Sequence, residues 1–473
     1  MQRILNVMNE LTKKWSDFKQ SRFVRNLNRV LLCKYFPFLS TVISLICFYT
    51  GFDILGFYNL AITTVLICLF ADDLTPTLTP ILFLTVLPSK KSTSISEYLG
   101  QTHILAQLIV LAVIVVLAII FRFSSIVVRK KFKPTPVFYG LCFLSLAFIL
   151  NGIFSENAQF KNFLYGLAMA FFFLGIFTFL KDDIDVSKEG IERIAFTFFA
   201  FSFVPIIELL VAYITTEGLI SDGGINRGLL AFGWGTYNSV GLLTNISMPF
   251  VIYLAGKKKF GFIFTAYSVL MLAVVALSCS RQAMISAAVV YPASIIALFI
   301  KGKNKIMNAI TVVSAFLVCL TILLIFHDKL FDYFIKLFKS IKVNGEWNGN
   351  GRTALWEAAL ENFKKAPIFG FGFYVDLLYI LQYSGGVWPM MYHNTFMELL
   401  GACGIVGLIA YLFHRVQTVQ SFFRNATYER FVVSLVILVL LITNIFDNPI
   451  FKIMPTMVYS FMLAVLVKSE KTE

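Results

Sequence analysis

The stretch at residues 103–121, HILAQLIVLAVIVVLAIIF, has no Asp, Glu, Lys or Arg, and it decides the class of fold. As an α-helix, a run of this length crosses a hydrocarbon layer of roughly 30 Å. The same character extends along the 473-residue chain, of which 58% is hydrophobic and only 14% is charged. A soluble core could not hide so much apolar surface. The sequence therefore predicts a polytopic membrane protein.

Apolar runs of this kind recur along the chain, and they predict an all-α fold with about fourteen transmembrane helices, within a range of about 12 to 14. They lie near residues 36–53, 54–70, 75–88, 103–121, 137–154, 161–180, 193–213, 235–254, 262–279, 283–300, 306–326, 396–413, 431–446 and 450–467. The expected parts are a basic N-terminal segment (1–35), a first set of helices (36–234), a second set (235–467) that includes one large extracytoplasmic loop with short helices (327–395), and a tail (468–473).

The net charge of +14 is unevenly distributed. If the N-terminus is cytoplasmic, the inner segments hold most of the 40 lysines and arginines, and the loop at 327–395 holds about half of the others. This distribution follows the positive-inside rule. We therefore expect both termini in the cytoplasm and no nucleic-acid partner.

The first 35 residues are basic and too polar to supply the apolar region of a signal peptide. Ile4, Met8, Leu11, Trp15 and Phe18 recur at helical spacing beside lysines and arginines. This pattern favours an amphipathic helix on an anionic inner leaflet. A disordered basic tail is the alternative.

Common cofactor motifs are absent from the sequence. The 7 cysteines show no CxxC or Cys/His ligand spacing. No HExxH, no GxxxxGK[ST] and no GxGxxG after a strand occurs either. We therefore expect no metal and no cofactor, and the usual zinc-protease, ATPase and Rossmann-enzyme classes are excluded.

Charges within the predicted helices are sparse, and Glu208 and Glu398 are the clearest acidic residues there. Buried charges would mark an ion pathway, so their scarcity disfavours a proton-coupled transporter. The loop at 327–395 is more informative, because loops of this length are usually functional. Its residues 330–342 have an amphipathic pattern, and a second helix is predicted to begin at Arg352 and end before Pro367.

Three residues are the candidate catalytic groups. Arg281 lies at the expected outer membrane edge, Arg352 opens the loop helix, and His393 lies in Tyr-His-Asn just before the next span. Taken singly, each has an ordinary interpretation: an arginine that snorkels to head groups, an exposed helix-start arginine, and a packed or surface histidine. All three are expected on one side of the membrane, which favours a shared site.

Four motifs in the second half of the chain resemble those of one family. They are Ser280-Arg-Gln, Gly351-Arg-Thr-Ala-Leu-Trp-Glu-Ala-Ala-Leu, Pro367-Ile-Phe-Gly-Phe-Gly and His393-Asn-Thr-Phe-Met-Glu-Leu-Leu-Gly-Ala-Cys-Gly-Ile-Val-Gly-Leu. In content and spacing they resemble the O-antigen ligases and Wzy-type polymerases, over about residues 235–467. Gln282 stands where the family often has glycine, a change that removes no titratable group.

The resemblance implies a metal-independent glycosyltransferase in the bacterial cytoplasmic membrane, with its site on the outer face. The donor would be an undecaprenyl-pyrophosphate-linked oligosaccharide, and the acceptor a sugar hydroxyl. Arg281 and Arg352 suit the leaving pyrophosphate because guanidiniums bind its oxygens bidentately and keep their protons. His393 suits a general base, since an ordinary imidazole pKa is about 6.5. Attack opposite the pyrophosphate would invert the anomeric centre.

Five further residues are candidates for substrate binding. Asp447, in Asp-Asn-Pro, is either a partner that orients the histidine or an arginine, or a solvated turn carboxylate. Arg227, with Tyr237 and Asn238 at the next helix start, resembles a polar helix entry of the family and is expected to bind sugar or phosphate. Asn394 follows the histidine directly.

Three functions remain open. A polymerase of surface-polysaccharide repeat units is favoured over a ligase that moves a finished glycan onto lipid A-core or another acceptor, although both share these motifs. A flippase for lipid-linked sugars is less favoured, because the two halves show no internal repeat. Expected partners are the lipid-linked oligosaccharide, the acceptor glycan, membrane lipids, chain-length regulators and flippases.

Overall fold

The computed structural model describes residues 18, 20–87, 102–129, 133–221, 224–325, 342–343, 346–347, 352–373, 392–424 and 427–470. The predicted amphipathic residues 4–15 and 330–341 lie outside these ranges. Within them the protein is mostly helical, with three two-stranded antiparallel hairpins.

The helices follow one another as α2 (Arg22–Leu31), α3 (Pro37–Thr50), α4 (Asp53–Phe70), η1 (Thr75–Thr77), α5 (Leu78–Phe83), η2 (Leu84–Val86), α7 (Thr102–Arg129), α8 (Pro136–Phe154), α9 (Phe160–Ala170), the π-helical η3 (Phe171–Gly175), α10 (Ile176–Leu180), α11 (Lys188–Thr215), η4 (Arg227–Leu229), α12 (Tyr237–Lys257), α13 (Gly261–Leu277), α14 (Arg281–Lys301), α15 (Lys305–Ile325), α17 (Arg352–Lys365), α19 (Thr395–Phe423), α20 (Tyr428–Phe446), η5 (Pro449–Phe451) and α21 (Ile453–Lys468). The hairpins are β1–β2 (Ile220–Ser221, Gly224–Ile225), β3–β4 (Ala231–Phe232, Gly235–Thr236) and β5–β6 (Lys342–Val343, Glu346–Trp347).

Nine helices in the described ranges are long and apolar enough to cross a membrane. Shorter apolar helical segments lie at Pro37–Thr50, Thr75–Val86, Gly261–Leu277, Lys305–Val318 and Ile453–Lys468. The prediction of a mostly helical, integral membrane protein is therefore confirmed. Each predicted apolar run contains helix, but a count of fourteen crossings stays a prediction, because nine of the described helices have both the length and the hydropathy of a span.

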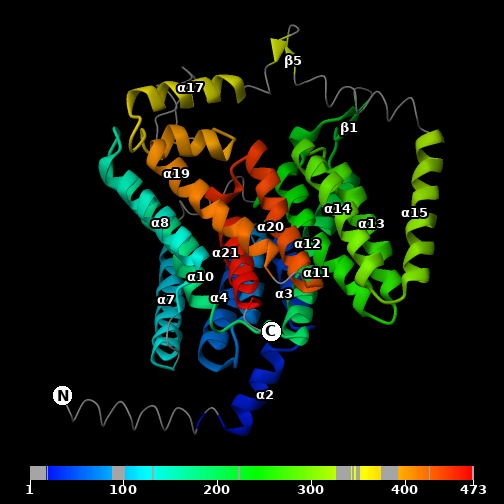
Figure 1. The fold of residues 1–473 in the computed structure, drawn as a ribbon. Helices are drawn as coiled ribbons and strands as arrows, with labels where there is room; N and C mark the ends of the chain where they lie inside the picture. Colours follow the sequence, from blue (N-terminus) through cyan, green and yellow to red (C-terminus); the bar gives the residue numbers. More distant parts are fainter. Residues whose placement is uncertain are drawn as a thin grey trace.

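Burial of the helices depends on their place in the bundle. α12 is enclosed by other helices, and every residue from Val240 to Gly256 is buried. α7 lies at the edge (Figure 1) and leaves apolar side chains such as Ile109 and Leu117 exposed. A helix that is apolar all round belongs in a protein core or in lipid. We conclude that α12 packs against protein and that α7 faces hydrocarbon.

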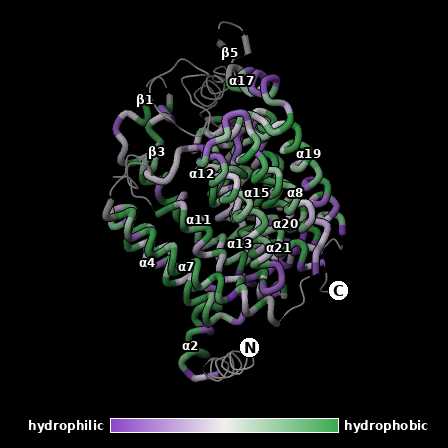
Figure 2. The backbone as a smooth tube through the Cα atoms, turned by 90° about the vertical axis from the view of Figure 1, so that its left-hand side faces the viewer, coloured by the Kyte–Doolittle hydropathy of each residue, from purple (hydrophilic) through white to green (hydrophobic). Residues whose placement is uncertain are grey.

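The polar parts gather toward the two ends of the bundle, with hydrophobic helices between them (Figure 2). α2 lies at one end, whereas α17 and the β1–β2 hairpin lie at the other (Figure 1). The segment between α11 and α12 contains two short hairpins and the turn η4. This end of the bundle carries the candidate site.

α19 is broken at Gly404, where φ is 63° and ψ is −162°. Such a backbone conformation is essentially restricted to glycine. The break frees backbone groups, and they pair with the Pro367–Gly372 motif instead of remaining unsatisfied. Four hydrogen bonds join the two segments: Phe371 N to Gly401 O (2.9 Å), Gly372 N to Ala402 O (3.0 Å), Ile405 N to Pro367 O (2.9 Å) and Val406 N to Ile368 O (3.2 Å).

Candidate active site

His393, Asp447 and Lys452 form one connected polar group. His393 Nδ1 lies 3.1 Å from Asp447 Oδ1, and Lys452 Nζ donates to Asp447 Oδ2 at 2.9 Å. The His393 side chain is 47% exposed and that of Asp447 only 8%, so the imidazole is accessible to a substrate while the carboxylate lies beneath it.

The hydrogen bond to Asp447 selects the tautomer of the imidazole. Burial alone would raise the pKa of the Asp447 carboxyl, but the charge of Lys452 and the hydrogen bonds from His393 and Lys452 hold it well below its usual range. An ionised carboxylate only accepts hydrogen bonds. It therefore favours the imidazole with its proton on Nδ1, which leaves Nε2 as the basic nitrogen.

A buried carboxyl holds the two loops of this group together. Tyr392 donates its N–H to Glu398 Oε2 at 2.8 Å, and Asn448 Nδ2 donates to the same oxygen at 2.9 Å. Glu398 is 3% exposed. His393, the residue after Tyr392, has a backbone φ of 51°, in the left-handed region. This conformation costs a non-glycine residue on the order of 1–2 kcal/mol. Glu398 thus fixes Tyr392, which precedes His393, and Asn448, which follows Asp447.

Arg281 begins α14 directly after a tight turn. Cys279 has a φ of 56°, and Ser280 Oγ caps the helix by accepting the N–H of Ala283 at 3.4 Å. Ser280 Oγ also donates to Asn238 Oδ1 at 2.8 Å. Asn238, predicted to bind substrate, therefore supports the turn that carries Arg281.

Arg352 begins α17, which packs against α19 through Tyr392. Trp356 Nε1 donates to the Tyr392 carbonyl at 3.1 Å, and Asn362 Nδ2 donates to the Tyr392 hydroxyl at 2.8 Å. Burial lowers the pKa of the Arg352 guanidinium, and the negative charge of Asp447 opposes that shift. The charge of the carboxylate that binds the histidine therefore acts on Arg352 as well.

Arg227 completes a cluster of three guanidiniums. Its charge acts on both Arg281 and Arg352, and the charge of Arg352 acts on Arg281. The Arg227 guanidinium lies 5.2 Å from the centre of the Tyr237 ring, within the range of a cation–π contact. Like charges repel, so a cluster of this kind suits a ligand with several negative charges, such as a phosphate or pyrophosphate.

The predicted site residues therefore lie at one end of the bundle. Asn394, like Asn238, uses its side chain for hydrogen bonds within the protein. Asn394 caps α19 by accepting the N–H groups of Phe396 and Met397 at 2.8 and 3.1 Å, and its Nδ2 donates to the Ile445 carbonyl at 2.9 Å. These bonds join α19 to the end of α20. A role of Asn394 in substrate binding stays a prediction, as do the catalytic roles of the other residues.

Lys452 is the site residue that sequence reasoning missed. It lies five positions after Asp447. This short distance along the chain could have indicated that the two residues interact. Glu398 stood out as an acid in a predicted helix, but its link between two loops could not be read from the chain.

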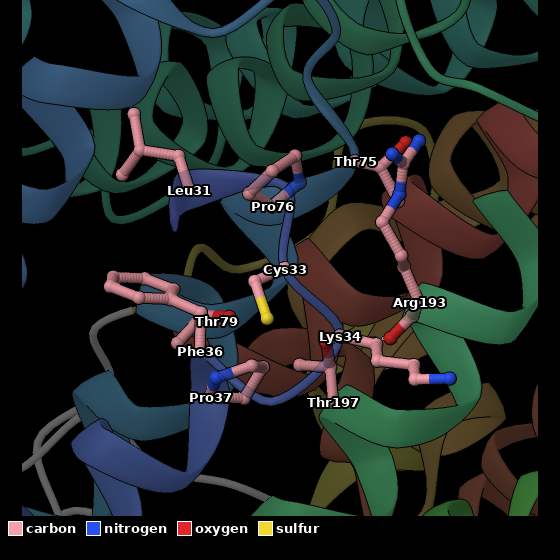
Figure 3. Close-up of a pocket in the computed structure, with 10 residues that line it drawn as sticks. All are labelled: Leu31, Cys33, Lys34, Phe36, Pro37, Thr75, Pro76, Thr79, Arg193 and Thr197. Atoms are coloured by element: carbon pink, nitrogen blue, oxygen red, sulfur yellow. Dashed lines mark hydrogen bonds between the residues drawn. The ribbon is translucent and has the colours of Figure 1, made fainter. Parts of the chain in front are cut away.

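A pocket at the opposite end of the bundle has a different character (Figure 3). Its wall includes Lys34 and Arg193. Lys34 Nζ pairs with Glu192 at 3.2 Å, and Arg193 Nη2 pairs with Asp73 at 2.9 Å and with Asp185 at 2.7 Å. These cations already face carboxylates, so this pocket is a poor candidate for an anionic substrate.

The comparison with known families supports the predicted resemblance. Residues 266–412 match the O-antigen ligase family. The matched residues include Arg281, Arg352 and His393, and the predicted resemblance is thereby confirmed. Arg227 and the Asp447–Lys452 pair lie outside the matched residues, in the segments before and after them. No curated protein matches the chain.

Proposed function

We propose that the protein transfers an undecaprenyl-pyrophosphate-linked oligosaccharide to a sugar hydroxyl, and that it polymerises repeat units of a surface polysaccharide. The observation that carries this proposal is the convergence of three guanidiniums with the His393–Asp447 pair. Cations and a base side by side match a reaction that releases an anion and activates a hydroxyl.

In the proposed reaction, the bond between the anomeric carbon and the pyrophosphate oxygen breaks, and its electron pair leaves with the lipid pyrophosphate. Arg227, Arg281 and Arg352 bind the departing oxygens. A close charge pair is worth on the order of 4 kcal/mol at an effective dielectric near 20, before desolvation. Because guanidiniums supply this positive charge themselves, we expect no metal requirement.

The acceptor hydroxyl attacks the same carbon. His393 Nε2 takes the hydroxyl proton while Asp447 stabilises the imidazolium that forms. The histidine then releases the proton to solvent or to the leaving pyrophosphate. Attack from the side opposite the leaving group inverts the anomeric configuration.

We further propose that the site faces the outside of the bacterial cytoplasmic membrane, with both termini inside. The support is the distribution of lysine and arginine along the sequence, together with the position of α2 at the end of the bundle opposite α17 (Figure 1).

A second candidate is a ligase that transfers a finished glycan to a separate acceptor lipid. It is favoured by the description of the matching family, O-antigen ligase. The two functions use the same donor and leaving group and differ in the acceptor hydroxyl.

The test is to reconstitute the purified protein in vesicles with an undecaprenyl-pyrophosphate-linked repeat unit and to resolve products by size. A ladder that is lost in His393→Ala and retained in His103→Ala, a matched control in α7, supports the polymerase. Transfer only after addition of lipid A-core supports the ligase. Absence of transfer to any acceptor would refute both, and a product with retained anomeric configuration would refute the inverting mechanism.

A further inference from the structure

A small pocket of about 30 Å³ lies between α3, α11 and the β3–β4 hairpin, at the same end of the bundle as the candidate site. Its wall includes Phe48, Tyr49, Glu208, Leu229 and Phe232.

Glu208 is the one acidic residue in this wall, and it is 1% exposed. Its Oε2 accepts a hydrogen bond from Trp234 Nε1 at 2.6 Å. Its Oε1 is buried and has no hydrogen-bond partner among the described residues. A buried polar atom without a partner costs about 1–3 kcal/mol, so a ligand that donates a hydrogen bond to Oε1 would recover that energy.

Aromatic residues form part of the pocket wall: Phe48, Tyr49 and Phe232. The ring of Trp234, the hydrogen-bond partner of Glu208, stacks on that of Phe232 with centroids 5.3 Å apart and an angle of 20°. A mostly apolar wall with a few placed polar groups is the usual composition of a small-molecule site. Tyr49, Thr215 and Thr216 also lie in this wall, and the carboxyl oxygen of Glu208 adds a group that pairs with a hydroxyl or an amide.

The pocket is connected to the guanidinium cluster by a short piece of chain. Arg227 and Tyr237, which contact one another in the cluster, lie at the two ends of the segment that contains Phe232 and Trp234. Tyr237 N also donates to the Leu230 carbonyl at 3.0 Å. A ligand bound at the cluster could therefore extend toward Glu208.

We propose that this pocket is a glycan subsite, in which Glu208 Oε1 accepts a hydrogen bond from a hydroxyl or acetamido arm of a sugar. The inference rests on the proposed glycosyltransferase function and adds a specificity-determining residue to it. A volume of about 30 Å³ admits such an arm rather than a whole sugar ring, since one water needs about 10–15 Å³. An isoprenoid chain would fill the apolar wall but would leave Oε1 without a donor.

The test measures ligand binding through the ¹⁹F NMR signal of Trp234. The full-length protein is labelled with 5-fluorotryptophan, and the ¹⁹F signal of Trp234 is assigned with Trp234→Phe. Methyl glycosides with free hydroxyl or acetamido groups are titrated in, beside farnesol as an apolar probe. We expect a saturable shift with at least one glycoside, and binding about 3- to 10-fold weaker in Glu208→Leu, the usual effect of losing one hydrogen bond.

Two further variants keep the result interpretable. Glu208→Gln retains an oxygen for Trp234 and tests the acceptor if Glu208→Leu does not fold. Lys365→Met, on the exposed end of α17, should leave the glycoside titration unchanged.

The subsite is refuted if no glycoside shifts Trp234 while the native protein still transfers glycan. It is also refuted if farnesol shifts the signal equally and both Glu208 variants respond as the native protein does. Saturable glycoside binding without any glycan transfer would support the pocket and refute the proposed transferase.

Discussion

His393 Nδ1 lies 3.1 Å from Asp447 Oδ1 across 54 positions of sequence. The pair joins the start of α19 to the end of α20, and the charge of Asp447 acts on Arg352, one of three arginines whose charges act on one another. Most predictions below follow from this arrangement.

Asp447→Asn should reduce transfer about 10- to 100-fold, because the substitution removes a charge-assisted hydrogen bond. Initial rates at a saturating donor concentration measure the effect. A native rate in Asp447→Asn would contradict the role of Asp447.

The same substitution should affect stability in a pH-dependent way. The pKa of Asp447 is lowered in the fold, so its ionisation stabilises the protein above the ordinary carboxyl pKa of about 3.9, and this contribution is lost as the pH falls. The difference in Tm between native protein and Asp447→Asn should be larger at pH 7 than at about pH 3. An equal difference at both would show that the carboxylate charge does not stabilise the fold.

Glu398→Leu should lower both stability and transfer, because the N–H of Tyr392 and the amide of Asn448 lose their common acceptor. Two buried donors without partners cost about 1–3 kcal/mol each. Glu398→Gln retains an oxygen at this place and should restore most of the transfer. If Gln does not rescue, the carboxylate has a role beyond positioning.

Gly404→Ala should destabilise the protein by at least about 2 kcal/mol. A Cβ there would lie 2.5 Å from the Ile368 carbonyl oxygen, and the backbone conformation is strained for any other residue. Thermal unfolding beside Ile409→Ala, an exposed position of the same helix, measures the effect. Equal Tm values would argue against a rigid break in α19.

Arg281→Lys should lose most of the transfer, although the charge is kept. Lysine is a point charge and cannot form the two parallel hydrogen bonds of a guanidinium with a phosphate. Inorganic pyrophosphate should compete with the donor in the native protein and less in this variant. Full activity with lysine would show that charge alone suffices at this position.

The membrane class and the resemblance of the second half of the chain to the O-antigen ligases and Wzy-type polymerases were readable from the sequence by itself. Hydropathy is a local property of a run such as 103–121, and the motifs around Arg281, Arg352 and His393 are contiguous in the chain. Only the tertiary structure decided how these pieces act on one another. Backbone hydrogen bonds between Pro367–Gly372 and the break in α19 leave no mark in residue identity, because every residue type carries the same peptide group.

The partners of the site were likewise decided by packing. Asp447 could be read as a turn carboxylate or as a partner of the histidine, and only the approach of α20 to α19 brings Oδ1 to Nδ1. Lys452 and the linking role of Glu398 depend on the same approach. Distances between segments far apart in sequence follow from how helices pack, and no local pattern encodes that packing.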